Sequence, residues 1–99
     1  MKHREIVGRI VEAVVWHLRR ENILVSTCEI REKTSKYEVF LRLEDNIAGL
    51  STIKIIYYNN NPLKTRIYTG RTSLDLRLKR IVKRELEKMV GGDEDTAQG

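Results

Sequence analysis

The chain has 99 residues, the size of one small domain, because chains divide into several cores only when each can have roughly 50–200 residues. Apolar residues make up 40% and charged residues 33%, which excludes disorder over most of the chain. The longest apolar stretch, residues 13–16, is far shorter than the roughly 20 residues of a membrane helix, and no signal peptide is recognisable. The lone Cys28 can form no internal disulfide. We therefore expect a cytoplasmic protein without a membrane partner.

The net charge of +5 is unevenly distributed. Three of the 14 acidic residues, Asp93, Glu94 and Asp95, lie close to the C-terminus. Without them, residues 1–90 hold 19 Lys and Arg against 11 acids, a net charge of +8. A folded domain with this positive net charge attracts polyanions. A heavily charged surface is also typical of hyperthermophilic proteins, so a hyperthermophilic archaeal source is an alternative explanation of the same composition.

The predicted elements follow from the spacing of apolar residues. Residues 3–21 repeat them three and four apart, which predicts a helix whose stripe, about 200° wide, leaves room for a second partner. Alternating patterns predict strands near residues 23–31, 37–44, 52–58 and 63–69, with Cys28 facing inward as a small core residue. Residues 59–62 are typical of a hairpin turn. Thr72 and Asp75 resemble a capping box that begins a second helix, and Gly91 and Gly92 end it.

The element order predicts a two-layer α+β domain over residues 1–92. Short connections between successive strands favour α-β-β-β-β-α with a four-stranded antiparallel meander and both helices packed on one face. Residues 93–99 are predicted to form a disordered acidic tail. The other face of the sheet stays open, so its side chains are the first place to look for a binding surface.

This order is similar to that of the double-stranded-RNA-binding domain, in which a helix, three strands and a helix follow each other. That family contacts phosphates with a run of lysines at the start of its second helix, whereas residues 70–75 hold one arginine and one aspartate. The similarity is one of topology, and no site residue follows from it.

The outward positions of the predicted strands combine cations with aromatic rings. Bases stack on rings while Lys and Arg neutralise phosphates, so this pattern is typical of a surface for single-stranded nucleic acid. The candidate residues are Arg31, Phe40, Arg42, Lys54, Tyr58, Lys64, Arg66 and Tyr68. An alternative interpretation is a homodimer that buries an apolar patch of Phe40, Ile56, Tyr58 and Tyr68, with Phe40 and Ile56 as its interface candidates and the cations as its rim.

The helices carry two further candidates. Trp16 lies opposite the apolar stripe of the first helix, and tryptophan beside arginines is enriched at protein interfaces, so Trp16 joins the candidate dimer interface. Burial of Trp16 under a loop and stacking of its ring on a nucleic-acid base are the alternative explanations. On the second helix, cations three and four apart form a basic ridge that can follow a phosphate backbone: Arg77, Arg80, Arg84 and Lys88. This basic ridge does not distinguish DNA from RNA.

The search for catalytic motifs finds no Gly-rich phosphate loop, no His-Glu-x-x-His and no recognisable nucleophile setting. We expect no catalytic residue, no metal site and no cofactor. A nuclease built on Glu38, Asp45 and Lys54 is a third interpretation, but Thr52 stands where its further acid belongs. The predicted function is a small basic domain that binds nucleic acid through charge and stacking without sequence specificity. The alternative is a homo-oligomeric structural or adaptor protein without such a ligand.

Overall fold

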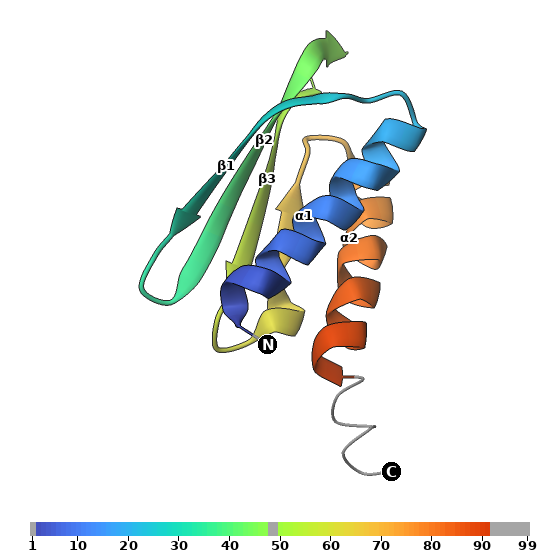
Figure 1. Ribbon diagram of the computed structural model, residues 1–99. Helices are drawn as coiled ribbons and strands as arrows, with labels where there is room; N and C mark the ends of the chain where they lie inside the picture. The colour runs from blue at the N-terminus through green and yellow to red at the C-terminus, as the bar shows by residue number, and fades with distance from the viewer. Residues whose placement is uncertain (1, 48–49, 92–99) are drawn as a thin grey trace.

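The computed structural model describes residues 2–47 and 50–91. Its elements are α1 (His3–Arg20), β1 (Val25–Glu32), β2 (Lys36–Ile47), β3 (Leu50–Tyr58), the 3-10 turn η1 (Pro62–Lys64), β4 (Arg66–Tyr68), α2 (Thr72–Leu86) and the π-helical turn η2 (Glu87–Gly91). The four strands lie in chain order and pair antiparallel. Both helices lie on one face of this sheet (Figure 1). The predicted two-layer α+β fold is confirmed, and the tail predicted for residues 93–99 lies outside the described residues.

The C-terminus of α1 sets the direction in which the chain enters the sheet. Asn22 adopts a left-handed conformation with φ of 63°, and its N–H donates to the carbonyl of Arg19. The N–H of Ile23 donates to the carbonyl of Leu18 over 2.9 Å, which completes a Schellman motif. Ile23 also packs against the core that contains Leu18. The helix therefore ends at Arg20, one residue before the end of the apolar spacing that predicted it. Within the described residues, neither helix has the length and apolar character that crossing a bilayer requires.

The core lies between the helices and the inner face of the sheet. Val39, Ile55 and Ile67 lie opposite one another on β2, β3 and β4, and all three are buried. Apolar residues of both helices cover them from one side, as the two helical stripes predicted. Among the described residues, nothing covers the other face of the sheet, which leaves it as a surface for binding (Figure 1).

β4 is shorter than the strand predicted for residues 63–69. Pro62 begins a 3-10 turn, and the side chain and N–H of Thr65 both donate to the Pro62 carbonyl, over 2.6 and 3.0 Å. Proline suits the first position of such a turn because it lacks an N–H and its φ is fixed. The turn takes residues 62–64 out of the sheet. In a strand over residues 63–69, Leu63 would share the inner face with Ile67; it is instead 53% exposed.

The start of α2 differs from the predicted capping box. Thr72 lies inside the helix, and no side chain caps it at Arg71. Asp75 instead accepts two hydrogen bonds from Thr69, from its N–H over 2.8 Å and from its hydroxyl over 2.5 Å. Gly70 permits the sharp connection between these elements, because its φ of 90° is one that side chains rarely adopt. The carboxylate therefore joins the end of β4 to the first turn of α2.

Replacing Asp75 by Ala tests this joint. Thr69 is buried, so the loss of its acceptor should lower the free energy of unfolding by about 1–3 kcal/mol. Asp75→Asn keeps an acceptor oxygen and should lose less. Urea denaturation measures both differences, and an Asp75→Ala variant as stable as the wild type would contradict the role assigned to this carboxylate.

β1 lies beyond the cover of the helices. Ile30 lies opposite the buried Val39, on the same inner face of the sheet, yet it is 43% exposed. Cys28 lies opposite the buried Leu41 and is exposed as well. The prediction that Cys28 is a core residue is therefore wrong, although its inward orientation is correct. The two helices therefore cover the inner face of β2, β3 and β4 and leave most of β1 exposed.

Candidate nucleic-acid interface

The outer face of the sheet, which the helices leave open, is organised in rows of residues that lie opposite each other on neighbouring strands. The first row contains Glu29, Phe40, Lys54 and Tyr68. The second row contains Arg31, Glu38, Ile56 and Arg66. Residues opposite each other share one face of a sheet, so charged and apolar or aromatic side chains are mixed across this surface. Arg42 and Tyr58 lie on the same face, because they are an even number of positions from Phe40 and Lys54 in their strands.

The first ring of this face, Phe40, lies between two cations. The guanidinium carbon of Arg31 is 4.8 Å from the centre of the ring, and the ammonium nitrogen of Lys54 is 5.6 Å from it. Both distances are within the reach of a cation–π interaction. The register explains the arrangement: Lys54 is directly opposite Phe40, and Arg31 is in the adjoining row.

The other two rings have cations beside them as well. The ammonium nitrogen of Lys64, which follows β3 in η1, is 5.7 Å from the centre of the Tyr58 ring. Arg66 donates a hydrogen bond to Tyr68, and this bond raises the pKa of the Arg66 guanidinium. Tyr68 is 45% exposed. Each ring of the outer face therefore has a positive charge next to it.

Only part of this positive charge is neutralised. Arg31 forms an ion pair with Glu29, which raises the pKa of the guanidinium, and Lys36 lies 3.8 Å from the carboxylate of Glu38. The remaining cations of the outer face have no carboxylate partner among the described residues: Arg42, Lys54, Lys64 and Arg66. These four exposed or half-buried side chains are free to meet phosphates.

Trp16 lies on the opposite side of the domain, in the helical layer. It is 63% exposed and borders a shallow groove of about 240 Å³ between α1 and α2. Arg20 of α1 and two members of the basic ridge, Arg84 and Lys88, line the same groove. The candidates Phe40 and Ile56 lie on the outer face of the sheet. The three residues predicted to form one dimer interface therefore do not form a single patch.

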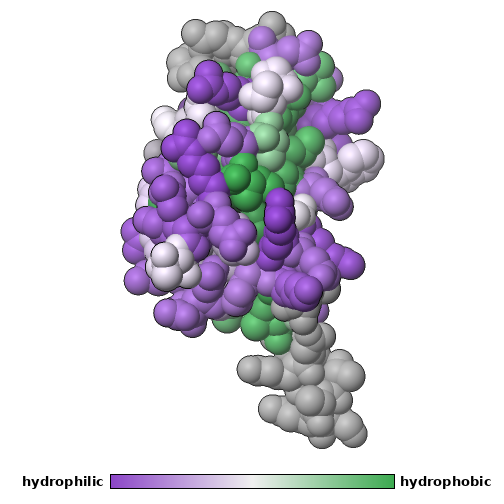
Figure 2. Space-filling model, turned by 60° about the vertical axis from the view of Figure 1, so that its left-hand side comes forward, coloured by the Kyte–Doolittle hydropathy of each residue, from purple (hydrophilic) through white to green (hydrophobic). Residues whose placement is uncertain are grey.

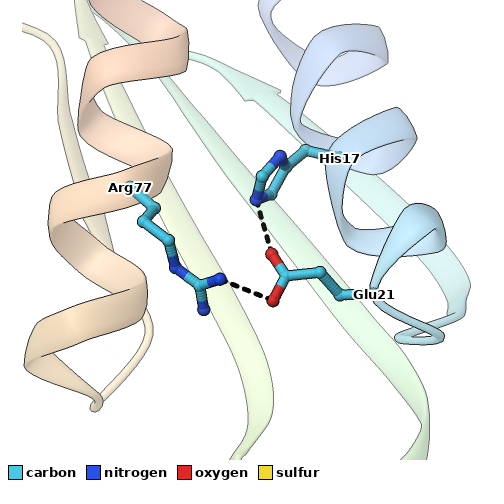
Figure 3. A network of polar contacts seen from close by, with 3 residues as sticks. All are labelled: His17, Glu21 and Arg77. Atoms are coloured by element: carbon cyan, nitrogen blue, oxygen red, sulfur yellow. Dashed lines mark hydrogen bonds and ion pairs between the residues drawn. The ribbon is translucent and has the colours of Figure 1, made fainter.

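The basic ridge is partly neutralised by two acids, Glu21 at the end of α1 and Glu85 on α2 itself. Figure 3 shows Glu21, at the end of α1, between His17 and Arg77: its carboxylate accepts a hydrogen bond from Arg77 over 2.7 Å and lies 2.5 Å from the His17 ring nitrogen. Lys88 likewise pairs with Glu85 over 3.2 Å. Of the ridge, Arg80 and Arg84 have no carboxylate partner among the described residues.

Two cations near the outer face were not among the predicted site residues. Lys36 lies opposite Tyr58 at the start of β2, one residue before the strand predicted for residues 37–44. Lys79 of α2 lines a depression of about 280 Å³ with Arg66 and Tyr68. The helical period places Lys79 about 200° around α2 from Arg77, but its closeness to β4 depends on how the helix packs.

Comparisons with known protein families, with curated proteins and with solved structures find no match. In the part of the chain that the structure describes, no group of three or more His, Cys, Asp and Glu side chains could hold a metal ion. Of the residues weighed for a nuclease, Glu38 and Lys54 both lie on the outer face, where Glu38 is opposite Ile56 and Lys54 is opposite Phe40.

Proposed function

We propose that this protein is a small non-catalytic domain that binds single-stranded nucleic acid without sequence specificity through the outer face of its sheet. The observation that carries the proposal is the pairing of each ring with a cation: Phe40 with Lys54, Tyr58 with Lys64, and Tyr68 with Arg66. Single-strand binders combine these two chemistries, because bases stack on rings and cations neutralise phosphates.

The rows of the sheet suggest the path that a bound nucleic-acid strand takes across the outer face. Phe40 and Tyr68 are two strands apart with Lys54 between them, so a strand lying across the sheet meets ring, cation and ring in turn. Neighbouring strands are about 4.8 Å apart, which separates the two rings by about 10 Å. A stacking surface of this kind has no hydrogen-bonding groups aimed at base edges, and it accepts DNA and RNA alike.

The basic ridge contributes attraction rather than the main contact in this proposal. Two of its four cations are paired with carboxylates, and the groove beside it is lined by one Trp and no Phe or Tyr among the described residues. The outer face offers three rings and four cations without such partners. The net charge of the whole body adds long-range steering to either surface.

Titration of labelled single-stranded and duplex oligonucleotides tests the proposal. Each phosphate neutralised on a single strand adds about −0.7 to the slope of log affinity against log salt, so four contacts give a slope of about −3. Affinity for the single strand should then fall about 50-fold between about 50 and 200 mM salt, with little difference between DNA and RNA or between base sequences. No binding at low salt, or binding that salt leaves unchanged, would refute the proposal.

A homodimeric state and a cytoplasmic location belong to the same proposal, and so does the hyperthermophilic archaeal source. The exposed thiol of Cys28 is suited to a reducing compartment. The second candidate function is a homo-oligomeric structural or adaptor protein, favoured by the exposure of Trp16 beside Arg20 and Arg84. A stable oligomer that binds no oligonucleotide would favour this second candidate.

A further inference from the structure

The uncovered edge of the sheet at β1 combines an apolar surface with unpaired backbone. From β4 to β1, the inner-face row of Ile67, Ile55, Val39 and Ile30 changes from buried to 43% exposed. Val11 and Val15 of α1 are only partly buried. Figure 2 shows a hydrophobic strip along this side of the molecule, with hydrophilic side chains on both flanks. The domain's own sheet therefore does not fully bury the wide apolar stripe predicted for α1.

The backbone of β1 presents hydrogen-bonding groups at this edge. The N–H of Lys33 donates to the carbonyl of Lys36 over 2.8 Å, so Lys33 points toward β2. Backbone groups alternate in direction along a strand. Those of Cys28, Ile30 and Glu32 consequently point away from the sheet. A long edge strand with an apolar face is a template for pairing with another strand, whereas the opposite edge, β4, has only three residues.

We infer that β1 pairs antiparallel with β1 of a second copy of this chain, about a two-fold axis at Ile30. This inference takes the homodimeric state from the proposed function and names its surface. The two Ile30 side chains then lie opposite each other on the inner face and cover the most exposed apolar position of that row. The outward N–H and C=O groups of Cys28, Ile30 and Glu32 all find partners on the other strand, and the two sheets join into one.

Charge complementarity favours a second copy of this chain as the partner of β1, and it favours the register with the two-fold axis at Ile30. With the axis at Ile30, Glu29 of each copy lies opposite Arg31 of the other, so two pairs of opposite charges form on the outer face. An axis at Glu29 would place two carboxylates opposite each other, and an axis at Arg31 would place two guanidinium groups there. An axis at Cys28 leaves both charges opposite neutral residues, Thr27 and Val25. Of these four registers, the one at Ile30 alone joins the opposite charges.

Sedimentation of the full chain without nucleic acid tests this interface separately from ligand binding. We expect the wild type to be a dimer and Ile30→Lys to be a monomer, because the substitution places two ammonium groups opposite each other. Leu76→Lys on α2 is the matched control, since Leu76 is similarly exposed, at 55%, and it should stay dimeric. Circular dichroism checks the fold of both variants. A monomeric wild type, or a dimeric Ile30→Lys, overturns the inference.

Oxidative cross-linking tests the register and does not depend on the lysine variant. Residues paired at the axis have Cα atoms about 5.5 Å apart, within the range of a disulfide. The double variant Ile30→Cys, Cys28→Ser should therefore form a covalent dimer. The control Thr27→Cys, Cys28→Ser should not, because its two thiols are six positions out of register. Failure of the first variant to cross-link, or efficient cross-linking of the wild type through Cys28, overturns the register at Ile30.

Discussion

Reversing the charge of Lys54 and Arg66 together should weaken the binding of a single-stranded oligonucleotide about 10- to 100-fold and reduce the salt dependence by about half. Both cations lie on the outer face without a carboxylate partner among the described residues, and each lies beside a ring. Removing two of four phosphate contacts lowers the slope of log affinity against log salt from about −3 to about −1.4. Fluorescence anisotropy at several salt concentrations measures both quantities.

The double variant Arg80→Glu, Arg84→Glu is the control, because it changes the net charge by the same amount on the helical layer. If general attraction were the whole effect, the two double variants would lose affinity equally. We expect the helical variant to lose much less. The reverse order, with the larger loss for Arg80 and Arg84, would move the contact surface to the basic ridge and Trp16.

Replacing Tyr57 by Ala should lower the free energy of unfolding by about 3–5 kcal/mol, the usual cost of removing a buried aromatic ring. Tyr57 is fully buried in the core, and its ring meets the edge of Tyr37 with 6.0 Å between centres. Its hydroxyl is hydrogen-bonded to His3 Nδ1 at 2.7 Å. Tyr57→Phe keeps the ring and removes this bond, so it should lose only about 0.5–1.5 kcal/mol. Urea denaturation measures both losses in the free energy of unfolding. Equal losses would contradict the assignment of most of the Tyr57 contribution to its ring.

The same pair of proteins tests the ionisation of Tyr57. Burial raises the pKa of its hydroxyl above the ordinary value of about 10. The folded state therefore keeps this proton at a pH at which the unfolded state releases it. The resulting stabilisation is present below about pH 10 and is lost as the pH rises toward the pKa of the folded state. The stability advantage of the wild type over Tyr57→Phe should shrink above about pH 10, and an advantage that grows there would refute the sign of the shift.

The fold could be predicted because its main features depend on local patterns. The stripe of α1 and the alternation around Val39 and Ile55 determine which residues face the core, and the short connections determine the strand order. β4 was predicted too long because the hydrogen bonds of Thr65 to Pro62 compete with the ladder. Thr72 was misassigned because Asp75 prefers the buried amide of Thr69, a contact six positions away that a capping pattern does not include.

The candidate site was predicted in its parts but not in its arrangement. Alternation along the strands placed Phe40 and Lys54 on the outer face, but the register that puts one opposite the other requires the paired strands. The ion pair of Arg77 with Glu21 joins residues 56 positions apart, so the helical spacing that predicted the basic ridge could not reveal it. The exposure of Ile30 depends on how far the helices reach over the sheet, a quantity that residue spacing does not contain.

The position of α2 after the sheet has a consequence for the order of folding. Neighbouring strands meet through short connections, whereas α1 and α2 join across most of the chain, as the pair of Glu21 and Arg77 shows. Contacts between distant residues form late, because closing a long loop costs more entropy than closing a hairpin. The last part of the core comes from the four buried residues of α2: Leu74, Leu78, Val82 and Leu86. During synthesis on the ribosome, the inner face of the sheet therefore remains partly exposed to water until the chain has been synthesised beyond Leu86.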